Sequence, residues 1–280
     1  MAIKITSDST CDLTEELLRA HQIEILPLYI MKDGSPFRDC VNITPEDIYR
    51  HVGGGGEITT TAAQNVEDYH SCFSRLSPLY EAVIHINIGV EFSSGYQNAV
   101  IAAKSFPNVY VVDSRNLSSG QGHVVLEAAR LAEEGVSPAR IVEQLRAFAD
   151  RVETSFVLSQ LEYMRKGGRC STVAALGANL LKLKPCIELS DGRMHVGKKY
   201  RGSYEKSLLE YARDRLWRRQ DIDVQRILVV HTACPPELLE QVCLEVENYT
   251  GVPPLACPPA GCTIASHCGP CTLGIMLVRK

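Results

Sequence analysis

The chain has 280 residues, of which 45% are hydrophobic and 22% charged, and its formal net charge is −4. This length and composition predict one large globular domain or two smaller ones with a sizeable core. The slightly acidic balance argues against a nucleic-acid-binding surface, which is usually strongly basic. No apolar run approaches the roughly 20 residues that a membrane-spanning helix needs.

The first residues and the cysteine content both favour a reducing compartment. The segment Met1–Asp8 is too short and polar for a signal peptide, which predicts a cytoplasmic location. The chain has 11 cysteines, an odd number, so they cannot all pair within one chain. We therefore expect reduced thiols that behave mostly as small apolar side chains.

The first half of the chain predicts a parallel sheet with helices on its faces. Apolar runs at 2–6, 82–88 and 109–113 are typical of strands, and each is followed by small polar residues and a helix start. Asp12 or Thr14 is the expected N-cap of the first helix. Repeated strand–helix units of this kind indicate a doubly wound α/β domain.

Small polar residues follow three of these strands. The segments are Ser7–Thr10, Ser93–Gly95 and Ser118–Gly122. Because open α/β sheets bind ligands at the carboxyl ends of their strands, these segments are expected to lie near a binding site. A helix start with free hydroxyls and backbone N–H groups favours an anion.

The segment between the first two of these strands predicts several smaller elements. It contains an apolar run at 23–30, a turn at Asp33-Gly34, and a helix capped by Thr44 with Pro45 in its first turn. The four glycines at 53–56 lack the Lys and Ser/Thr of a phosphate loop, so a flexible connector is expected there.

The pattern changes near residue 153. We expect one domain over residues 1–153, a parallel α/β domain, and a second over 154–280, an α+β domain with a mixed sheet. The elements predicted for the second are a strand at 155–158, a short helix at 161–169, an apolar helix at 173–183, a hairpin at Asp191-Gly192, a helix at 203–220, a strand at 226–231, a helix at 237–249 and two strands flanking a turn at 266–271.

Three interpretations compete for the last of these turns. Cys268 and Cys271 have the spacing of a redox dithiol, the nearby cysteines could join His267 in a metal site, or His267 alone could be the functional group. The residues after Cys271 predict a strand rather than the helix that activates a dithiol, and the cysteine spacings are irregular for zinc.

A hydrolase is a further possibility. A Ser–His–Asp set could be assembled from Ser93, His267 and either Asp8 or Asp113. However, the sequence has no Gly-x-Ser-x-Gly elbow and no His-Glu-x-x-His metal motif. A cleft with neutral hydroxyls, one histidine and much apolar surface suits an anion with an apolar tail.

Several short motifs follow one another over nearly the whole chain. In order, they are 3–13, Leu26-Pro27-Leu28, 59–61, 92–97, 112–114 with 119–122, 161–169, Lys184-Pro185, Asp191-Gly192 and 266–270. This succession resembles the DegV family of bacterial fatty-acid-binding proteins. Thr59-Thr60-Thr61 stands where that family has a Thr-Ser pair, but Ala62 replaces the serine.

The resemblance implies a lipid-binding protein rather than an enzyme, with no cofactor and no metal. A long-chain fatty acid such as palmitate would lie between the two domains. Its carboxylate would be held by the residues that match the family's binding positions: Thr61, Ser93, Ser94, His267 and Arg169.

The resemblance also implies a protein partner. Some family members present the bound acid to a fatty acid kinase, and Arg201 matches a basic patch thought to face that kinase. The runner-up is an acyl hydrolase or transferase that uses Ser93 and His267.

Overall fold

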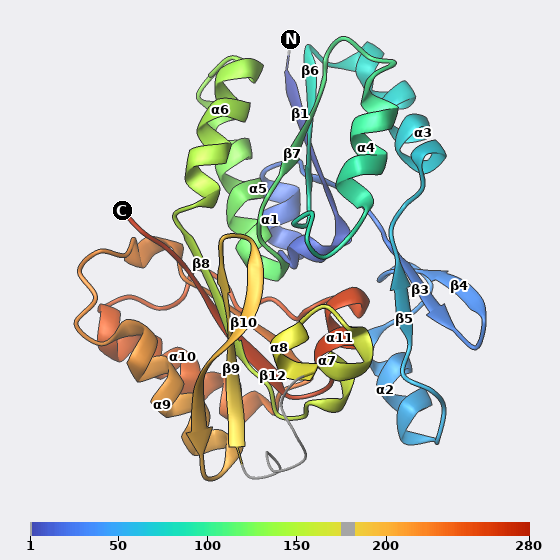
Figure 1. Ribbon diagram of the computed structural model, residues 1–280. Coiled ribbons are helices and arrows are strands. Elements are labelled where there is room, and N and C mark those ends of the chain that lie inside the picture. The colour runs from blue at the N-terminus through green and yellow to red at the C-terminus, as the bar shows by residue number, and fades with distance from the viewer. Residues whose placement is uncertain (1, 175–182) are drawn as a thin grey trace.

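The structure is a computed structural model that describes residues 2–174 and 183–280. Within them, four strands form a parallel sheet in the order β2-β1-β6-β7 (Figure 1). These strands are β1 (Ile3–Asp8), β2 (Glu24–Leu26), β6 (Ala82–Asn87) and β7 (Val109–Asp113). The predicted parallel α/β architecture is therefore confirmed. The predicted helix at 173–183 lies mostly outside the described residues, and α8 covers Ser171–Ala174.

Helices cover both faces of the parallel sheet, because its strands carry apolar side chains on both sides. Ile84 and Ile86 pack toward α5 (Ser118–Glu133) and α6 (Pro138–Ala149). Val83, on the opposite face, packs toward α3 (Val66–Leu76) and α4 (Gly95–Ala103). The result is a three-layer arrangement whose strand ends point toward the rest of the chain (Figure 1).

A second sheet of five strands runs in the order β10-β9-β8-β12-β11. All pairs of neighbouring strands are antiparallel, and parallel pairing is limited to isolated bridges from β11 to Ala256 and Pro259. This differs from the expected mixed sheet. The strands are β8 (Val152–Val157), β9 (Leu183–Ser190), β10 (Arg193–Arg201), β11 (Leu228–Thr232) and β12 (Thr272–Val278).

Side chains along β12 point alternately to the two faces of this sheet, and each face is covered by different elements. Leu273, Ile275 and Leu277 pack toward α9 (Tyr204–Leu216) and α10 (Pro236–Thr250). Met276 and Val278 face the other way and join the core that contains α5. Helix α5 thus contacts strands of both sheets. The division at residue 153/154 falls inside β8, and separate domains at that position remain a proposal.

A small antiparallel sheet in the order β4-β3-β5 lies beside α2 (Pro45–Gly53). It consists of β3 (Tyr29–Lys32), β4 (Ser35–Arg38) and β5 (Thr60–Ala62). The predicted turn is confirmed, since Asp33 and Gly34 both have positive φ, as a two-residue type I′ hairpin requires. Thr44 caps α2 in a capping box, also as predicted.

The first helix, α1 (Glu15–Ala20), is capped by Thr14, which settles the choice between the two predicted caps. Asp12 instead adopts a left-handed conformation and makes contacts with distant parts of the chain. The described helices include none long and apolar enough to cross a bilayer.

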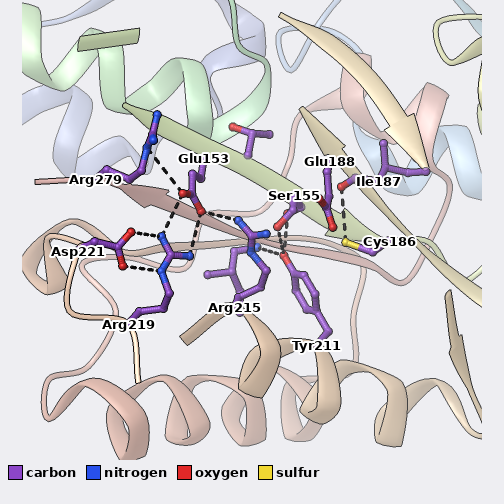
Figure 2. Close-up of polar contacts among 12 residues, drawn as sticks. Glu153, Ser155, Cys186, Ile187, Glu188, Tyr211, Arg215, Arg219, Asp221 and Arg279 are labelled. Atoms are coloured by element: carbon purple, nitrogen blue, oxygen red, sulfur yellow. Dashed lines mark hydrogen bonds and ion pairs between the residues drawn. The ribbon is translucent and has the colours of Figure 1, made fainter. Parts of the chain in front are cut away.

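Glu153 on β8 gathers three arginines around one carboxylate (Figure 2). Arg215 of α9 donates to Oε2 at 2.7 Å, Arg219 donates to both oxygens, and Arg279 lies 3.7 Å from Oε1. Asp221 accepts two further bonds from Arg219. Charge-assisted bonds of this kind fix α9 and the C-terminal residues against β8.

The segment 262–268 is helical, so the strand predicted before the turn at 266–271 is wrong. It forms α11 (Cys262–Cys268), whereas the second predicted strand is confirmed as β12. A short apolar run cannot be assigned to strand or helix by periodicity alone. Here distant carboxylates cap the helix, and these contacts could not be read from the local sequence.

Candidate functional site

A cavity of about 350 Å³ lies where the parallel sheet, β5 and β8 meet α11 and α7 (Glu162–Gly167). It is lined by elements from both halves of the chain. The lining side chains are Leu28, Thr61, Ala62, Ala63, Ile88, Phe92, Ser93, Ser94, Leu117, Phe156, Met164, Arg169, Met194, Thr263, Ile264, His267 and Cys268. Cavities of about 300–1,000 Å³ are typical of small-molecule sites.

The five side chains predicted to bind a carboxylate all line this cavity. Thr61 comes from β5, Ser93 and Ser94 from the loop before α4, Arg169 from the segment after α7, and His267 from α11. Chain segments far apart in the sequence therefore meet at one polar wall. Their role as ligands of a carboxylate stays a prediction.

The loop that carries Ser93 and Ser94 packs against the end of β6. Gly95 opens α4 in a crowded place, since a Cβ there would lie 3.0 Å from the Tyr69 hydroxyl and 3.3 Å from Asn87 Nδ2. Ser93 Oγ accepts a bond from Gly95 N at 3.2 Å, which leaves its own O–H free to donate. The positive end of the α4 dipole adds to a preference for anions at this wall.

His267 and Thr61, which both line the cavity, form a hydrogen bond with each other. The distance between His267 Nε2 and Thr61 Oγ1 is 2.8 Å, while His267 Nδ1 is buried and has no partner among the described residues. Burial, with a smaller contribution from the charge of Arg169, lowers the pKa of His267 to about 4. The imidazole of the ligand-free protein is therefore neutral at pH 7.

Gly167 allows His267 to pack directly on the backbone of α7. A Cβ at this position would lie 2.2 Å from His267 Nδ1. Gly168 then ends α7 with a φ of 68°, a left-handed conformation that glycine adopts without strain. The short helix predicted at 161–169 is thus confirmed, and its two final glycines both end the helix and make room for the imidazole.

Arg169 follows directly and keeps its guanidinium at the solvent-exposed side of the cavity. Its Nη1 donates to Gly167 O at 2.8 Å, and its Nε lies 3.5 Å from Phe92 O. No carboxylate neutralises it among the described contacts. Arg169 therefore supplies a permanent positive charge at the polar wall.

The N-terminus of α11 is held by two aspartates from the first half of the chain. Asp39 accepts from Cys262 N at 2.8 Å and from Thr263 N at 3.2 Å, and Asp12 accepts from Gly261 N at 2.8 Å. Carboxyl oxygens at a helix N-terminus satisfy free N–H groups, and an ionised carboxylate also complements the dipole. They fix the helix that carries His267 to the cavity.

Further bonds hold the side of α11. Ser266 Oγ lies 2.7 Å from Thr59 Oγ1, and Cys262 Sγ lies 3.2 Å from Ile43 O. Sequence reasoning did not find Asp39, and it considered Asp12 only as a possible N-cap and as part of the matching segment 3–13. Their partners lie more than 200 residues away, so no local signal could have identified them.

Apart from Thr263, the rest of the cavity wall is apolar. Ile88, Phe92, Leu117, Phe156 and Ile264 are all buried there. A separate small cavity of about 20 Å³ shares the lining residues Leu117, Phe156, Ile264 and Cys268 with the first and is otherwise lined mainly by residues on or near β11 and β12. The polar wall and the apolar depth together suit an amphipathic ligand.

The structure gives the cysteines of the final turn no dithiol character. Cys268 lines the cavity, and burial raises the pKa of its thiol to about 12. Cys271 Sγ instead lies 3.4 Å from Ala233 O. A reactive dithiol needs a lowered thiol pKa, so these surroundings favour the apolar-filler interpretation.

The Ser–His–Asp set considered from the sequence is not assembled. Asp8 accepts bonds from Ile88 N and Gln121 Nε2, and Asp113 accepts from Arg115 N and Val90 N. Neither carboxylate bonds His267, whose Nδ1 has no partner among the described residues. The imidazole lacks the orienting acid of a catalytic triad.

Comparison with known proteins supports one family. The family model described as "Uncharacterised protein, DegV family" matches residues 2–280. A DegV domain-containing protein of Caldanaerobacter subterraneus is 32% identical over 282 residues, covering 99% of both chains. One from Clostridium acetobutylicum is 30% identical with the same coverage.

Two solved structures are also similar. A fatty-acid-binding DegV family protein from Thermus thermophilus has a TM-score of 0.88 at 30% identity, covering 100% of both chains. A stearic-acid-binding protein from Eubacterium ventriosum has a TM-score of 0.87 at 28% identity, covering 99% of this chain and 98% of that one. With a family model that matches nearly every residue and relatives of the same length, this chain belongs to the DegV family.

Proposed function

We propose that the protein binds one long-chain fatty acid in the cavity described above, with the carboxylate at the polar wall and the acyl chain in the apolar depth. The observation that carries this proposal is that one cavity combines hydroxyls, an imidazole and an arginine with a mostly apolar remainder, which includes the buried Ile88, Phe92, Leu117, Phe156 and Ile264. The solved relatives from Thermus and Eubacterium are described as binding fatty acids, which supports it.

The hydrogen bond between His267 and Thr61 gives the carboxylate a donor. A carboxylate accepts only, so each group that holds it must donate. If neutral His267 carries its proton on Nε2, it donates to Thr61 Oγ1, and the Thr61 O–H is then free to donate to the ligand. His267 thus acts through Thr61, while Ser93 and Ser94 offer hydroxyls and Arg169 offers charge.

The acyl chain supplies most of the affinity. Each CH₂ group removed from water contributes about 0.8 kcal/mol. The small cavity beyond Leu117 and Phe156 offers a path toward β11 and β12 for the end of a long chain. Affinity is therefore expected to rise with chain length until that depth is filled.

Protein purified from a bacterial host is expected to release about one fatty acid per chain. Denaturing extraction followed by mass spectrometry of the lipid fraction measures this. Delipidated protein should then bind palmitate at least tenfold more tightly than hexadecanol, which has the same chain length but no carboxylate. Recovery of a nucleotide, or equal affinity for the acid and the alcohol, would contradict the proposal.

We further propose that the bound acid is presented to a fatty acid kinase through the surface around Arg201. This residue ends β10 and is exposed. Nearby Lys198 is paired with Glu210 and Asp214, at 2.9 and 2.6 Å, so its charge is partly neutralised. Arg201 has no ion pair among the described residues and is available to an acidic partner.

The Arg201→Ala variant is expected to bind palmitate with unchanged affinity but to be phosphorylated on its bound acid about tenfold less efficiently. The measurement is kinase turnover at subsaturating protein. Arg140→Ala, an exposed arginine on α6, is the matched control and should behave as the parent. Equal losses of binding and turnover in Arg201→Ala would instead indicate a folding defect.

A further inference from the structure

Two cysteines outside the cavity have their sulfur atoms in direct contact. Cys243 on α10 and Cys257, which follows that helix by seven residues, have their sulfur atoms 3.1 Å apart. This is about 1 Å longer than a disulfide bond. Both side chains are half-buried, so small reagents can reach them. Neither lines the cavity of the proposed function.

Both cysteines are carried by firmly held backbone. Val242 and Val246 bury one side of α10 in the core over the second sheet. The segment with Cys257 runs along β11, where Ala256 O accepts from Val229 N at 3.1 Å and Ala260 N donates to His231 O at 2.8 Å. The short distance between the sulfurs is therefore set by two anchored elements.

The two thiols differ in their chemistry. The hydrogen bond with Cys243 lowers the pKa of Cys257, against the opposing effect of burial, and raises that of Cys243. Elsewhere burial raises thiol pKa values, to about 12 for Cys186 and Cys268 and about 11 for Cys72. Because the thiolate is the nucleophile, Cys257 is the cysteine expected to attack the oxidant.

We propose that Cys243 and Cys257 are a reversible redox site, which a hydroperoxide converts to a disulfide and a cellular dithiol reduces again. Cys257 releases its proton, and the thiolate attacks one oxygen of hydrogen peroxide. The O–O bond breaks, a sulfenic acid forms, and the leaving hydroxide takes up the released proton to become water. Cys243 then attacks the Cys257 sulfur, the S–O bond breaks, and a second water leaves. Two thiols lose two electrons in total, and one peroxide becomes two waters.

The disulfide would join the C-terminal half of α10 to the segment that leads into α11. It would close a loop between residues 14 positions apart. Cross-links of this kind restrict the unfolded chain and raise its free energy. The oxidised protein is therefore expected to melt about 5 °C or more above the reduced protein.

The test is mild oxidation of fully reduced, purified protein with hydrogen peroxide. Non-reducing peptide mapping should find a Cys243–Cys257 cross-link, intact mass should fall by about 2 Da, and dithiothreitol should reverse both changes. Cross-linking confined to other cysteines, or oxidation of Cys257 to the sulfinic acid without a cross-link, would overturn the proposal.

Single variants separate the two roles. In Cys243→Ser, Cys257 should stop at the sulfenic acid, which dimedone captures, and the rise in melting temperature should disappear. In Cys257→Ser, oxidation of Cys243 should be at least tenfold slower than oxidation of Cys257 in the parent. Cys271→Ser is the control, since it removes another half-buried thiol. In this variant the cross-link between Cys243 and Cys257 should form at the parent's rate. Equal oxidation rates in both pair variants would disprove the assignment of Cys257 as nucleophile.

Discussion

Replacing His267 with alanine is expected to weaken fatty-acid binding by about ten- to a hundredfold, the equivalent of one charge-assisted hydrogen bond of about 1.5–3 kcal/mol. The imidazole orients the Thr61 hydroxyl from 2.8 Å, and without it that hydroxyl no longer points reliably at the carboxylate. Titration of delipidated protein with palmitate measures the change.

Three further variants test whether His267 acts through Thr61 and whether the effect is specific to this histidine. Thr61→Val should lose a similar amount of affinity, and the His267→Ala, Thr61→Val double variant should lose little more, because the two residues act as one unit. His195→Ala changes a half-buried histidine on β10 that does not line the cavity, and it should bind as the parent does. Full additivity of the two single losses would show that His267 holds the ligand independently of Thr61.

Replacing Asp12 with asparagine is expected to remove a loss of stability that the parent suffers between pH 6.5 and pH 8. Burial raises the pKa of Asp12 from its ordinary 3.8 to about 8. Between these values the folded protein keeps a proton that the unfolded chain has released, so the free energy of unfolding falls as the pH rises. Over this window the loss amounts to about 1.5 kcal/mol.

Buried histidines oppose this effect in the lower part of the window. Burial lowers the pKa values of His85, His123 and His267 to about 3, 4 and 4, so stability rises with pH until the unfolded chain has released its histidine protons, around and just above pH 6.5. The parent and Asp12→Asn share this contribution, so it cancels when the two are compared. An asparagine at position 12 can still accept from Gly261 N and can donate to Ser118 Oγ, the two present partners of Asp12.

Urea unfolding at pH 6.5 and pH 8 measures the effect. From pH 6.5 to pH 8, the free energy of unfolding should change by about 1.5 kcal/mol less favourably in the parent than in Asp12→Asn. Asp191→Asn changes an exposed aspartate in a turn with positive φ, which asparagine tolerates, and should follow the parent. Parallel behaviour of parent and Asp12→Asn would show that Asp12 is already ionised at pH 6.5.

The sequence by itself determined the elements whose signals are local. The strands at 3–8, 82–87 and 109–113 carry short apolar runs followed by helix starts, and Thr44 with Pro45 marks the beginning of α2. The Asp191-Gly192 pair adopts the positive φ values of a hairpin turn. Backbone conformation at such places depends on the residues themselves, so the pattern is sufficient.

The family resemblance also identified the polar side chains that meet in the cavity. Thr61, Ser93, Ser94, Arg169 and His267 come from four chain segments, and no spacing rule would join them. Only the order of motifs over the whole chain placed them together, and that order led to the DegV family, which the family model matches over residues 2–280. Their binding role awaits the experiments above.

The tertiary structure alone decided how His267 is held. The residues 262–268 form a helix rather than a strand because Asp39 and Asp12 accept its first N–H groups, and their carboxylates arrive from the other end of the chain. The contact of Cys243 with Cys257 and the neutral state of His267 likewise arise from packing. Burial and long-range hydrogen bonds are properties of the folded arrangement, and no local pattern of residues encodes them.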